Sequence, residues 1–248
     1  MAGSTARRGG VSEPPFDSLN LSFTVGDRPE HVVENRRRLL EALASDLAEM
    51  VVPELVHGPA AAAVDARHAG LGSRRHDDTV PGVDALVTAT PGLVLAVTVA
   101  DCVPILLLDP LTPAVGVAHA GWRGTAGHAA ARTVACMEER LGSRPADLLA
   151  HLGPSIGPAS FEVGPDVVRA VHRAYGEDPA LVTTVGERTY VDLWSANARD
   201  LVAAGLDEDN IETAALDTYT AERDLFSARR HRRCGRGMGY ISLRTPAG

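Results

Sequence analysis

The 248-residue sequence contains no lysine, so all 24 of its basic side chains are arginines. This absence excludes sites that depend on a lysine amine, such as the lysine-containing phosphate loop, Schiff-base chemistry and serine–lysine dyads. Long apolar runs are also lacking, since no stretch approaches the roughly 18 to 20 residues that cross a bilayer. The N-terminal MAGSTARRGG has no apolar segment typical of a secretion signal. We therefore expect a cytoplasmic protein without a membrane partner.

Cysteine is scarce, and acidic side chains outnumber basic ones. The three cysteines, Cys102, Cys136 and Cys234, are too few and too scattered for a disulfide framework, which agrees with a reducing compartment. The net charge of −8 argues against nucleic acid as the main partner. No H-E-x-x-H, C-x-x-C or deaminase-type P-C-x-x-C motif is present.

Three apolar runs near the middle of the chain predict buried strands, because they are short, rich in valine and leucine, and bounded by turn-forming residues. They cover residues 93–99, 103–108 and 114–118. Further strands are expected at 18–23, 51–56, 84–88, 148–152, 188–191, 211–216 and 240–243, and helices at 27–47, 125–141, 165–175 and 194–204.

The rest of the chain shows no internal repeat and no linker. Residues 1–15 are rich in glycine, serine, arginine and proline, and predict a flexible tail. Residues 58–80 lack periodicity and predict a long loop, in which His68 and His76 are interpreted as exposed. The simplest interpretation is one α/β (α+β) domain over residues 1–248, with a mixed β-sheet flanked by helices.

Polar side chains with metal-binding chemistry follow three separate predicted strands. His57, Cys102 and His119 lie too far apart in the sequence for a zinc finger, but strand ends can bring distant residues together. Two imidazoles and a thiolate suit zinc or copper, and three protein ligands leave a fourth position open for water or substrate. Cys102 with His119 equally suits a metal-free nucleophile and base, because both sites need a thiolate beside an imidazole. A buried structural thiol with unrelated histidines is the third interpretation.

Two arginine-containing segments could bind an anion. Arg123 and Thr125 open a predicted helix, whose free backbone N–H groups attract negative charge. Ser227, Arg229 and Arg230 form a second basic cluster, which alternatively is a solvated tail. In an acidic protein such clusters suit a small phosphate or carboxylate better than DNA.

Other motifs are interpreted as structural. The arginine run 36–38 is interpreted as a solvated helix face, and the glycine-rich run 235–239 as a turn. The serine of the 153–157 GPSIG segment is interpreted as part of a tight turn, because no helix follows where a nucleophile elbow requires one.

Seven motifs in order carry a resemblance to a known family. They are ARRGGVS, SLNLS, PGVDALVT, ADCVPILLLD, VGVAHAGWRGT, LGPSIGPASFEVG, and FSARR with CGRGMGYISL. Together they resemble the YfiH-type family, long labelled multicopper polyphenol oxidases or laccase-domain proteins and now described as zinc-dependent purine nucleoside phosphorylases with adenosine deaminase activity. The resemblance implies an α/β sandwich, with purine nucleosides and phosphate as partners; it does not predict the oligomeric state.

The family's metal ligands correspond to the three strand-end residues, His57, Cys102 and His119, so the resemblance implies Zn²⁺, with copper possible in the same site. It makes Cys102, His119 and Arg123 candidate catalytic residues. For substrate binding, the candidates are Arg7, Asn20, Asp84, Thr125, Ser227, Arg229 and Arg230. The arginines and Thr125 would bind the anion, and Asp84 or Asn20 would contact the ribose or the base.

The sequence departs from the family pattern at a few positions near these motifs. Leu55 replaces the glutamine of QVHG, Asp217 the cysteine before FSYRR, and Ala228 the tyrosine of FSYRR. These changes put substrate preference in doubt more than metal binding. The alternative functions are a copper-dependent polyphenol oxidase, a metal-free Cys–His hydrolase and a non-catalytic regulator that binds nucleosides or metal.

Overall fold

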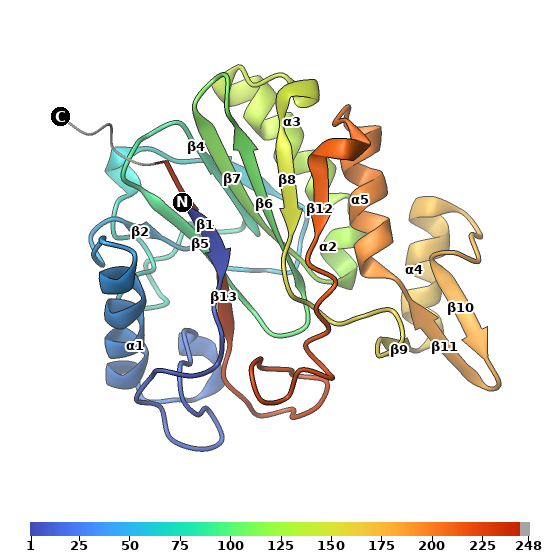
Figure 1. Ribbon diagram of the computed structural model, residues 1–248, viewed down its shortest axis with the longest axis horizontal. Coiled ribbons are helices and arrows are strands. Elements are labelled where there is room, and N and C mark those ends of the chain that lie inside the picture. The colour runs from blue at the N-terminus through green and yellow to red at the C-terminus, as the bar shows by residue number, and fades with distance from the viewer. Residues whose placement is uncertain (244–248) are drawn as a thin grey trace.

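Two β-sheets packed face to face lie between helices in the computed structural model, which describes residues 1–243 (Figure 1). The larger sheet has six strands in the order β12-β8-β6-β7-β4-β3 and mixes parallel with antiparallel pairs. Its strands are β3 (Ala61–Ala63), β4 (Ala85–Thr88), β6 (Val103–Asp109), β7 (Ala114–Ala120), β8 (Leu149–Leu152) and β12 (Ile211–Thr213).

The second sheet has four strands in the order β1-β13-β5-β2. Its strands are β1 (Ala2–Ser4), β2 (Met50–Val51), β5 (Val94–Val99) and β13 (Gly237–Ser242). A third, antiparallel sheet is built from β9 (Glu162–Val163), β10 (Val182–Val185) and β11 (Arg188–Val191), and it projects beside α4 at the edge of the molecule (Figure 1). The mixed sheets flanked by helices confirm the predicted fold class.

Helices cover the outer faces of both large sheets. α1 (Pro29–Ala42) packs on the four-stranded sheet, and α3 (Ala129–Leu141) and α5 (Leu193–Ala203) pack on the six-stranded one (Figure 1). α2 (Trp122–Ala126) packs against α3, α5 and α4 (Pro165–Tyr175). Short 3₁₀ turns form at Phe23–Val25, Ala66–His68, Pro145–Asp147 and Glu208–Asn210. None of the helices within residues 1–243 is both long and apolar enough to span a bilayer.

The central strands are apolar throughout because both of their faces are covered. In β6, Ile105 and Leu107 face α3 and α5, whereas Leu106 between them faces the four-stranded sheet. In β5, Leu95 and Val97 likewise face the six-stranded sheet. This two-residue alternation between two cores explains why the sequence shows continuous apolar runs instead of an apolar–polar pattern.

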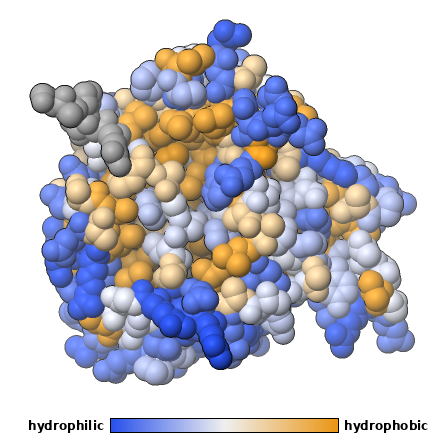
Figure 2. All heavy atoms as spheres, viewed as in Figure 1, coloured by the Kyte–Doolittle hydropathy of each residue, from blue (hydrophilic) through white to orange (hydrophobic). Residues whose placement is uncertain are grey.

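Part of the six-stranded sheet remains open to solvent. Figure 2 shows apolar side chains gathered on the visible face, over β6 and β8. Leu106, Leu108, Leu149 and Ile241 line a shallow groove there, and Leu149 is 41% exposed.

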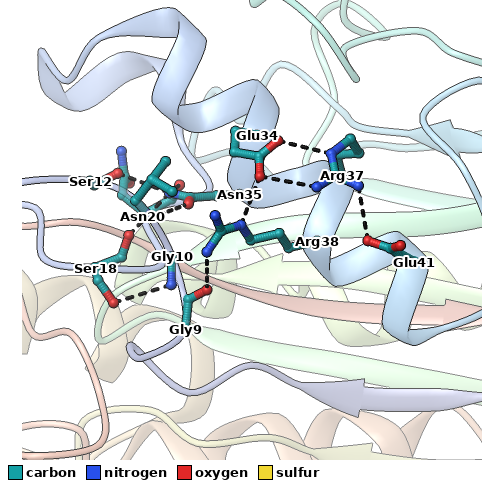
Figure 3. Close-up of polar contacts among 11 residues, drawn as sticks. Gly9, Gly10, Ser12, Ser18, Asn20, Glu34, Asn35, Arg37, Arg38 and Glu41 are labelled. Carbon is teal, nitrogen blue, oxygen red and sulfur yellow. Dashed lines mark hydrogen bonds and ion pairs between the residues drawn. The ribbon is translucent and has the colours of Figure 1, made fainter.

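The N-terminal segment is ordered, so the predicted flexible tail is wrong. β1 pairs with β13 through Ala2 and Ile241, and the Arg7 N–H donates to the Asp224 carbonyl at 2.8 Å. The Val11 N–H donates to the Asn35 side chain of α1 (2.8 Å). The Asn35 amide in turn donates to Ser12 (2.9 Å), as drawn in Figure 3. These partners are distant in sequence, so composition alone cannot reveal the order.

Several predicted elements differ in the structure. Residues 18–23 do not form a strand, because Asn20 Oδ1 accepts the Ser22 N–H (3.2 Å) and closes a local turn. The helix predicted at 27–47 ends at Ala42, and residues 58–80 contain β3 and a 3₁₀ turn. The predicted helix 125–141 is split into α2 and α3 by His128, whose φ is 61°.

The glycine-rich run 235–239 enters strand β13, which corrects its interpretation as a turn. A Cβ on Gly239 would lie 2.6 Å from the Cβ of Pro104 in β6, so the close approach of the two sheets requires glycine there. The GPSIG segment is structural, as predicted, but it is not a tight turn, because Ser155 forms an isolated parallel bridge with Asp217 and the turn follows at 158–160. Its Ser155 is fully buried and its Oγ accepts a hydrogen bond from the Trp194 indole at 2.6 Å.

Candidate metal centre and cavity

The three predicted metal ligands come together at one end of the central strands. His119 lies in β7, Cys102 in the turn between β5 and β6, and His57 in the segment that follows β2. Their ligand atoms all lie within 4.8 Å of one another, and the two imidazole rings meet edge to face with centroids 5.0 Å apart. His119 is buried, Cys102 is partly buried and His57 is exposed, so the group opens toward solvent on one side.

Asp84, just before β4, positions two of the three residues. Its carboxylate accepts the backbone N–H groups of His57 (2.9 Å) and Gly58 (2.8 Å) and contacts Nδ1 of His119 (2.8 Å). The contact at Nδ1 leaves Nε2 of His119 for the metal. Such carboxylate–histidine pairs fix the ring orientation in metal sites. His57 has a φ of 61°, a backbone conformation that the two hydrogen bonds to Asp84 stabilise.

Small and acidic neighbours hold Cys102 in place. A Cβ on Gly121 would lie 2.8 Å from the Cys102 Sγ, so the glycine after β7 leaves room for the thiol. Asp101 has a φ of 87°, and its carboxylate accepts the Thr218 hydroxyl and the Arg229 N–H, both at 2.7 Å. The turn that carries Cys102 is therefore fastened to the segment that follows β12.

The electrostatics favour a thiolate at Cys102. Burial opposes its charge, but the charge of His119 and hydrogen bonds from His119 and His57 lower the pKa of the thiol to about 6. Burial also opposes the charge of His119, but Cys102 and Asp84 raise the pKa of His119 to about 10. Asp84 remains ionised because its hydrogen bonds from His119 and from backbone N–H groups outweigh burial and lower its pKa.

The donor set fits a borderline-soft cation. Thiolate and imidazole are the ligands that zinc and copper prefer, and the three residues could hold a metal with a position left open. These are the residues that the sequence singled out, so the structure brings all three predicted ligands together.

A cavity of about 470 Å³ adjoins this group. All three candidate ligands line it, together with apolar side chains such as Phe23, Val52 and Leu55 and polar ones such as His76, Thr98 and Arg236. Loop residue His76 therefore belongs to the cavity wall, whereas His68 caps its own 3₁₀ turn through Asp65.

The residues predicted to bind ribose or base occupy other positions. Asp84 contacts His119 and the backbone of residues 57–58 and does not line the cavity. Asn20 is fully buried, where its amide donates to Asp27 (2.9 Å) and its oxygen accepts the Arg236 N–H (2.9 Å); Figure 3 shows Asn20 in its turn beside Ser12 and Asn35. Both residues therefore act through other groups.

The residues predicted to bind phosphate are also absent from the cavity wall. Arg123 stacks on Trp122, with its guanidinium 4.2 Å from the ring centre, and lines a separate groove against α4. Thr125 is fully buried, where its hydroxyl accepts a hydrogen bond from Asn197. Arg7 donates to the Asp17 carbonyl and stacks on Phe226.

The C-terminal cluster is likewise structural. Ser227 is fully buried, and its hydroxyl accepts the Arg230 N–H at 3.2 Å. The Arg230 guanidinium donates to the carbonyls of Thr218 (2.7 Å) and Leu225 (2.8 Å), and Arg229 stacks on Phe161. These contacts hold the chain after β12 and leave these side chains outside the cavity.

Sequence reasoning missed the two arginines that do line the cavity, Arg36 and Arg236. Arg36 sits in a run of three arginines on α1 and is only 2% exposed, so the solvated-face interpretation is wrong for it. Arg236 lies in the glycine-rich run that was interpreted as a turn. The sequence signal for Arg236 was its place between two glycines, and a charged residue between glycines does not by itself indicate a binding site.

Comparison with known proteins now adds to this geometry. The family described as multi-copper polyphenol oxidoreductase laccase matches residues 1–244. The chain belongs to this laccase-like family. The purine nucleoside phosphorylase YlmD of Geobacillus stearothermophilus is 40% identical over 248 residues, which cover 98% of this chain and 90% of YlmD. These matches confirm the resemblance inferred from the motifs.

Two further similarities extend over most of this laccase-like chain. A protein named adenosine deaminase RL5, from an unknown prokaryotic organism, is 37% identical over 217 residues, covering 87% of this chain and 82% of RL5. The crystal structure of YlmD from Geobacillus stearothermophilus superposes with a TM-score of 0.95 at 40% identity, covering 99% of this chain and 92% of that one. The single-domain architecture is thus shared.

The departures from the family motifs fall in two kinds of place. Leu55 and Ala228 line the cavity, where the smaller or apolar side chains alter its wall. Asp217 accepts the Gly157 N–H (3.0 Å) and the Ser160 hydroxyl (2.6 Å), and so holds the turn at 158–160. It does not line the cavity.

Replacing Asp84 with asparagine in this laccase-like protein is expected to weaken metal binding by about 10- to 100-fold, as is usual when the partner of a metal-binding histidine is lost. The asparagine side chain has the size of aspartate but only one acceptor oxygen. The two carboxylate oxygens of Asp84 contact three groups, which are the backbone N–H groups of His57 and Gly58 and the ring of His119. Metal affinity is measured by competition with a chelator. Asp217→Asn is the matched control, and equal affinity in Asp84→Asn and wild type would contradict the positioning role.

Proposed function

We propose that the protein is a metal-dependent purine nucleoside phosphorylase that cleaves adenosine, inosine and methylthioadenosine with phosphate, and that it also deaminates adenosine. The observation that carries this proposal is the His57–Cys102–His119 group at the wall of the 470 Å³ cavity. The names of YlmD and RL5, a phosphorylase and a deaminase, support the same substrate class.

The cavity has the size and lining that a nucleoside needs. Small-molecule sites usually measure about 300–1,000 Å³ and combine apolar walls with a few polar groups. Phe23, Val52 and Leu55 offer apolar surface for a purine, and Thr98 and His76 offer polar groups.

In phosphorolysis, a phosphate oxygen forms a bond to C1′ of the ribose while the bond from C1′ to N9 breaks and the purine leaves with the electron pair. In deamination, water adds to C6 and ammonia leaves. His57, Cys102 and His119 would hold a zinc ion, which would supply Lewis-acid polarisation and lower the pKa of a water molecule. Asp84 contacts Nδ1 of His119 and would hold the proton there, which would leave Nε2 to bind the ion.

A copper-dependent polyphenol oxidase is the second candidate, because the matching family is described as a multi-copper laccase. Multi-copper oxidation requires several copper ions held by separate ligand sets. Within residues 1–243, His57, Cys102 and His119 make the one group of three or more possible ligands close enough to share an ion. One such group favours hydrolytic or phosphorolytic chemistry over oxidation at several coppers.

One assay separates these functions. Adenosine and inosine are incubated with and without phosphate, and the free base, ribose 1-phosphate and ammonia are quantified by chromatography. Formation of base and ribose 1-phosphate only with phosphate supports the proposal; no product from either nucleoside refutes it. The zinc and copper contents of protein purified without added copper, and oxidation of a phenol by the same sample, test the oxidase alternative.

A further inference from the structure

The cavity that holds the candidate metal group is lined by two arginines, and they differ in how many of their guanidinium nitrogens have hydrogen-bond partners. Arg36 donates through Nε and Nη2 to the Leu21 carbonyl (2.9 and 2.7 Å) and through Nη1 to the carbonyls of Gly72 and Ser73. Its guanidinium also stacks on Phe23, 4.5 Å from the ring centre. Arg36 is therefore occupied with holding the wall of the cavity.

Arg236 differs because one edge of its guanidinium is unpartnered. Nη1 donates to the carbonyls of Cys234 (2.9 Å) and Gly235 (3.1 Å). Within residues 1–243, neither Nε nor Nη2 has a hydrogen-bond partner, and the guanidinium forms no ion pair. Nε–H and the adjacent Nη2–H are parallel donors on one edge, which is the geometry that binds two oxygens of a phosphate.

The backbone of Arg236 is held rigidly beside the metal group. Its N–H donates to Asn20 Oδ1 at 2.9 Å, and its carbonyl accepts the Leu21 N–H at 3.0 Å. The next residue, Gly237, pairs with Val99 at the end of β5, three residues before Cys102. A fixed arginine loses little freedom when it binds a ligand, so its position favours anion binding.

We propose that Arg236 is the residue that binds phosphate during phosphorolysis, through Nε and Nη2, and that Asn20 positions it. This inference rests on the proposed function and identifies the anion-binding residue of that site. Arg236 orients a phosphate oxygen toward C1′ and stabilises the charge of the phosphate while the bond from C1′ to N9 breaks. The arginines singled out from the sequence are engaged elsewhere, which leaves this role to Arg236.

The test uses Arg236→Gln, which removes the charge, and Arg236→Lys, which keeps it but lacks the two-donor edge. We expect the KM for phosphate to rise on the order of 10- to 100-fold in Arg236→Gln, the range for a lost charge-assisted contact, and by an intermediate amount in Arg236→Lys. Adenosine deamination, which needs no phosphate, is measured in parallel, and we expect it to fall much less than phosphorolysis in both variants. Circular dichroism and thermal unfolding establish that each variant is folded.

Arg232→Gln is the matched control, because Arg232 lies on the same segment, is exposed and does not line the cavity. Its KM for phosphate should match that of wild type. An equal rise in Arg232→Gln and Arg236→Gln would assign the effect to net charge and overturn the proposal, as would an unchanged KM in Arg236→Gln.

A binding measurement separates this inference from the proposed function. Inorganic phosphate is titrated into the metal-loaded protein and followed by ³¹P NMR line width, with and without hypoxanthine. If wild type does not catalyse phosphorolysis but binds phosphate, and Arg236→Gln binds it at least about tenfold more weakly, the proposed function fails and the phosphate site stands. Absence of phosphate binding by wild type under both conditions, or equal binding by Arg236→Gln, refutes the site.

Discussion

Replacing Cys102 with alanine is expected to remove the bound metal and to slow both nucleoside phosphorolysis and deamination on the order of 1,000-fold or more. Lewis-acid catalysis supplies several kcal/mol of transition-state stabilisation, which corresponds to a rate effect of about this size. The variant keeps two of the three candidate ligands, His57 and His119. Because His57 is exposed and is held mainly through its backbone, these two are expected to bind the metal weakly. Metal content by elemental analysis and turnover of inosine are measured on the same preparation.

Cys136→Ala is the matched control for this substitution. Cys136 lies in α3, is also only partly buried and is not among the residues that line the cavity. The control should retain the metal and wild-type turnover. Phosphorolysis retained by a metal-free Cys102→Ala protein would refute the metal-dependent mechanism.

Chelation and alkylation distinguish a metal enzyme from a metal-free Cys102 hydrolase. In the proposed mechanism, removal of the metal abolishes turnover and added zinc restores it. A hydrolase that uses the Cys102 thiolate, whose pKa is lowered to about 6, would instead remain active in chelator and be lost on alkylation.

The grouping of the three candidate ligands could be predicted because Cys102 and His119 lie beside apolar runs that form buried strands. The runs of β5, β6 and β7 are continuous since both faces of these strands are covered, so their ends are clear in the sequence. Strand ends of neighbouring strands meet at one edge of a sheet, which places Cys102 beside His119. His57 depended on a less regular segment, in which only Met50–Val51 is a strand.

The order of the first residues could not be predicted because the partners of Ala2 and Arg7 are more than 200 residues away. Ala2 pairs with Ile241, and the Arg7 N–H donates to the Asp224 carbonyl. A segment rich in glycine, serine and arginine carries no local sign of such partners. Asn20 could not be placed from the sequence for the same reason, because its oxygen accepts the backbone N–H of the distant Arg236. Its amide also donates to the nearby Asp27.

Charge was a poor guide to the anion site for a physical reason. Arginine has five N–H donors and is frequently used to bind backbone carbonyls of irregular segments. Arg230 and Arg36 do this here, and Arg123 stacks on an aromatic ring. The number of arginines near a motif therefore says little about ligand binding; their remaining donors decide it, and these depend on the three-dimensional structure.

Substituting methionine for Arg36 is expected to lower the free energy of unfolding by about 3 kcal/mol. The change keeps most of the side-chain volume but leaves the buried carbonyls of Leu21, Gly72 and Ser73 without their donors, at about 1–3 kcal/mol for each unsatisfied group. Loss of the buried charge offsets part of this cost, because burial lowers the pKa of Arg36 to about 9 and so disfavours its charged form. Urea denaturation followed by circular dichroism gives the free energy.

Arg37→Met provides the matched control on the next residue of α1. Arg37 is exposed and pairs with Glu34 and Glu41 on the helix surface, as Figure 3 shows. Pairs of this kind are screened by water and contribute little, so the urea midpoint should not move measurably. If Arg36→Met is as stable as Arg37→Met, the hydrogen bonds of Arg36 to the buried carbonyls do not contribute to stability and the prediction fails. A selective loss in Arg36→Met instead shows that this arginine fastens α1 to the 72–73 segment and so maintains the cavity wall.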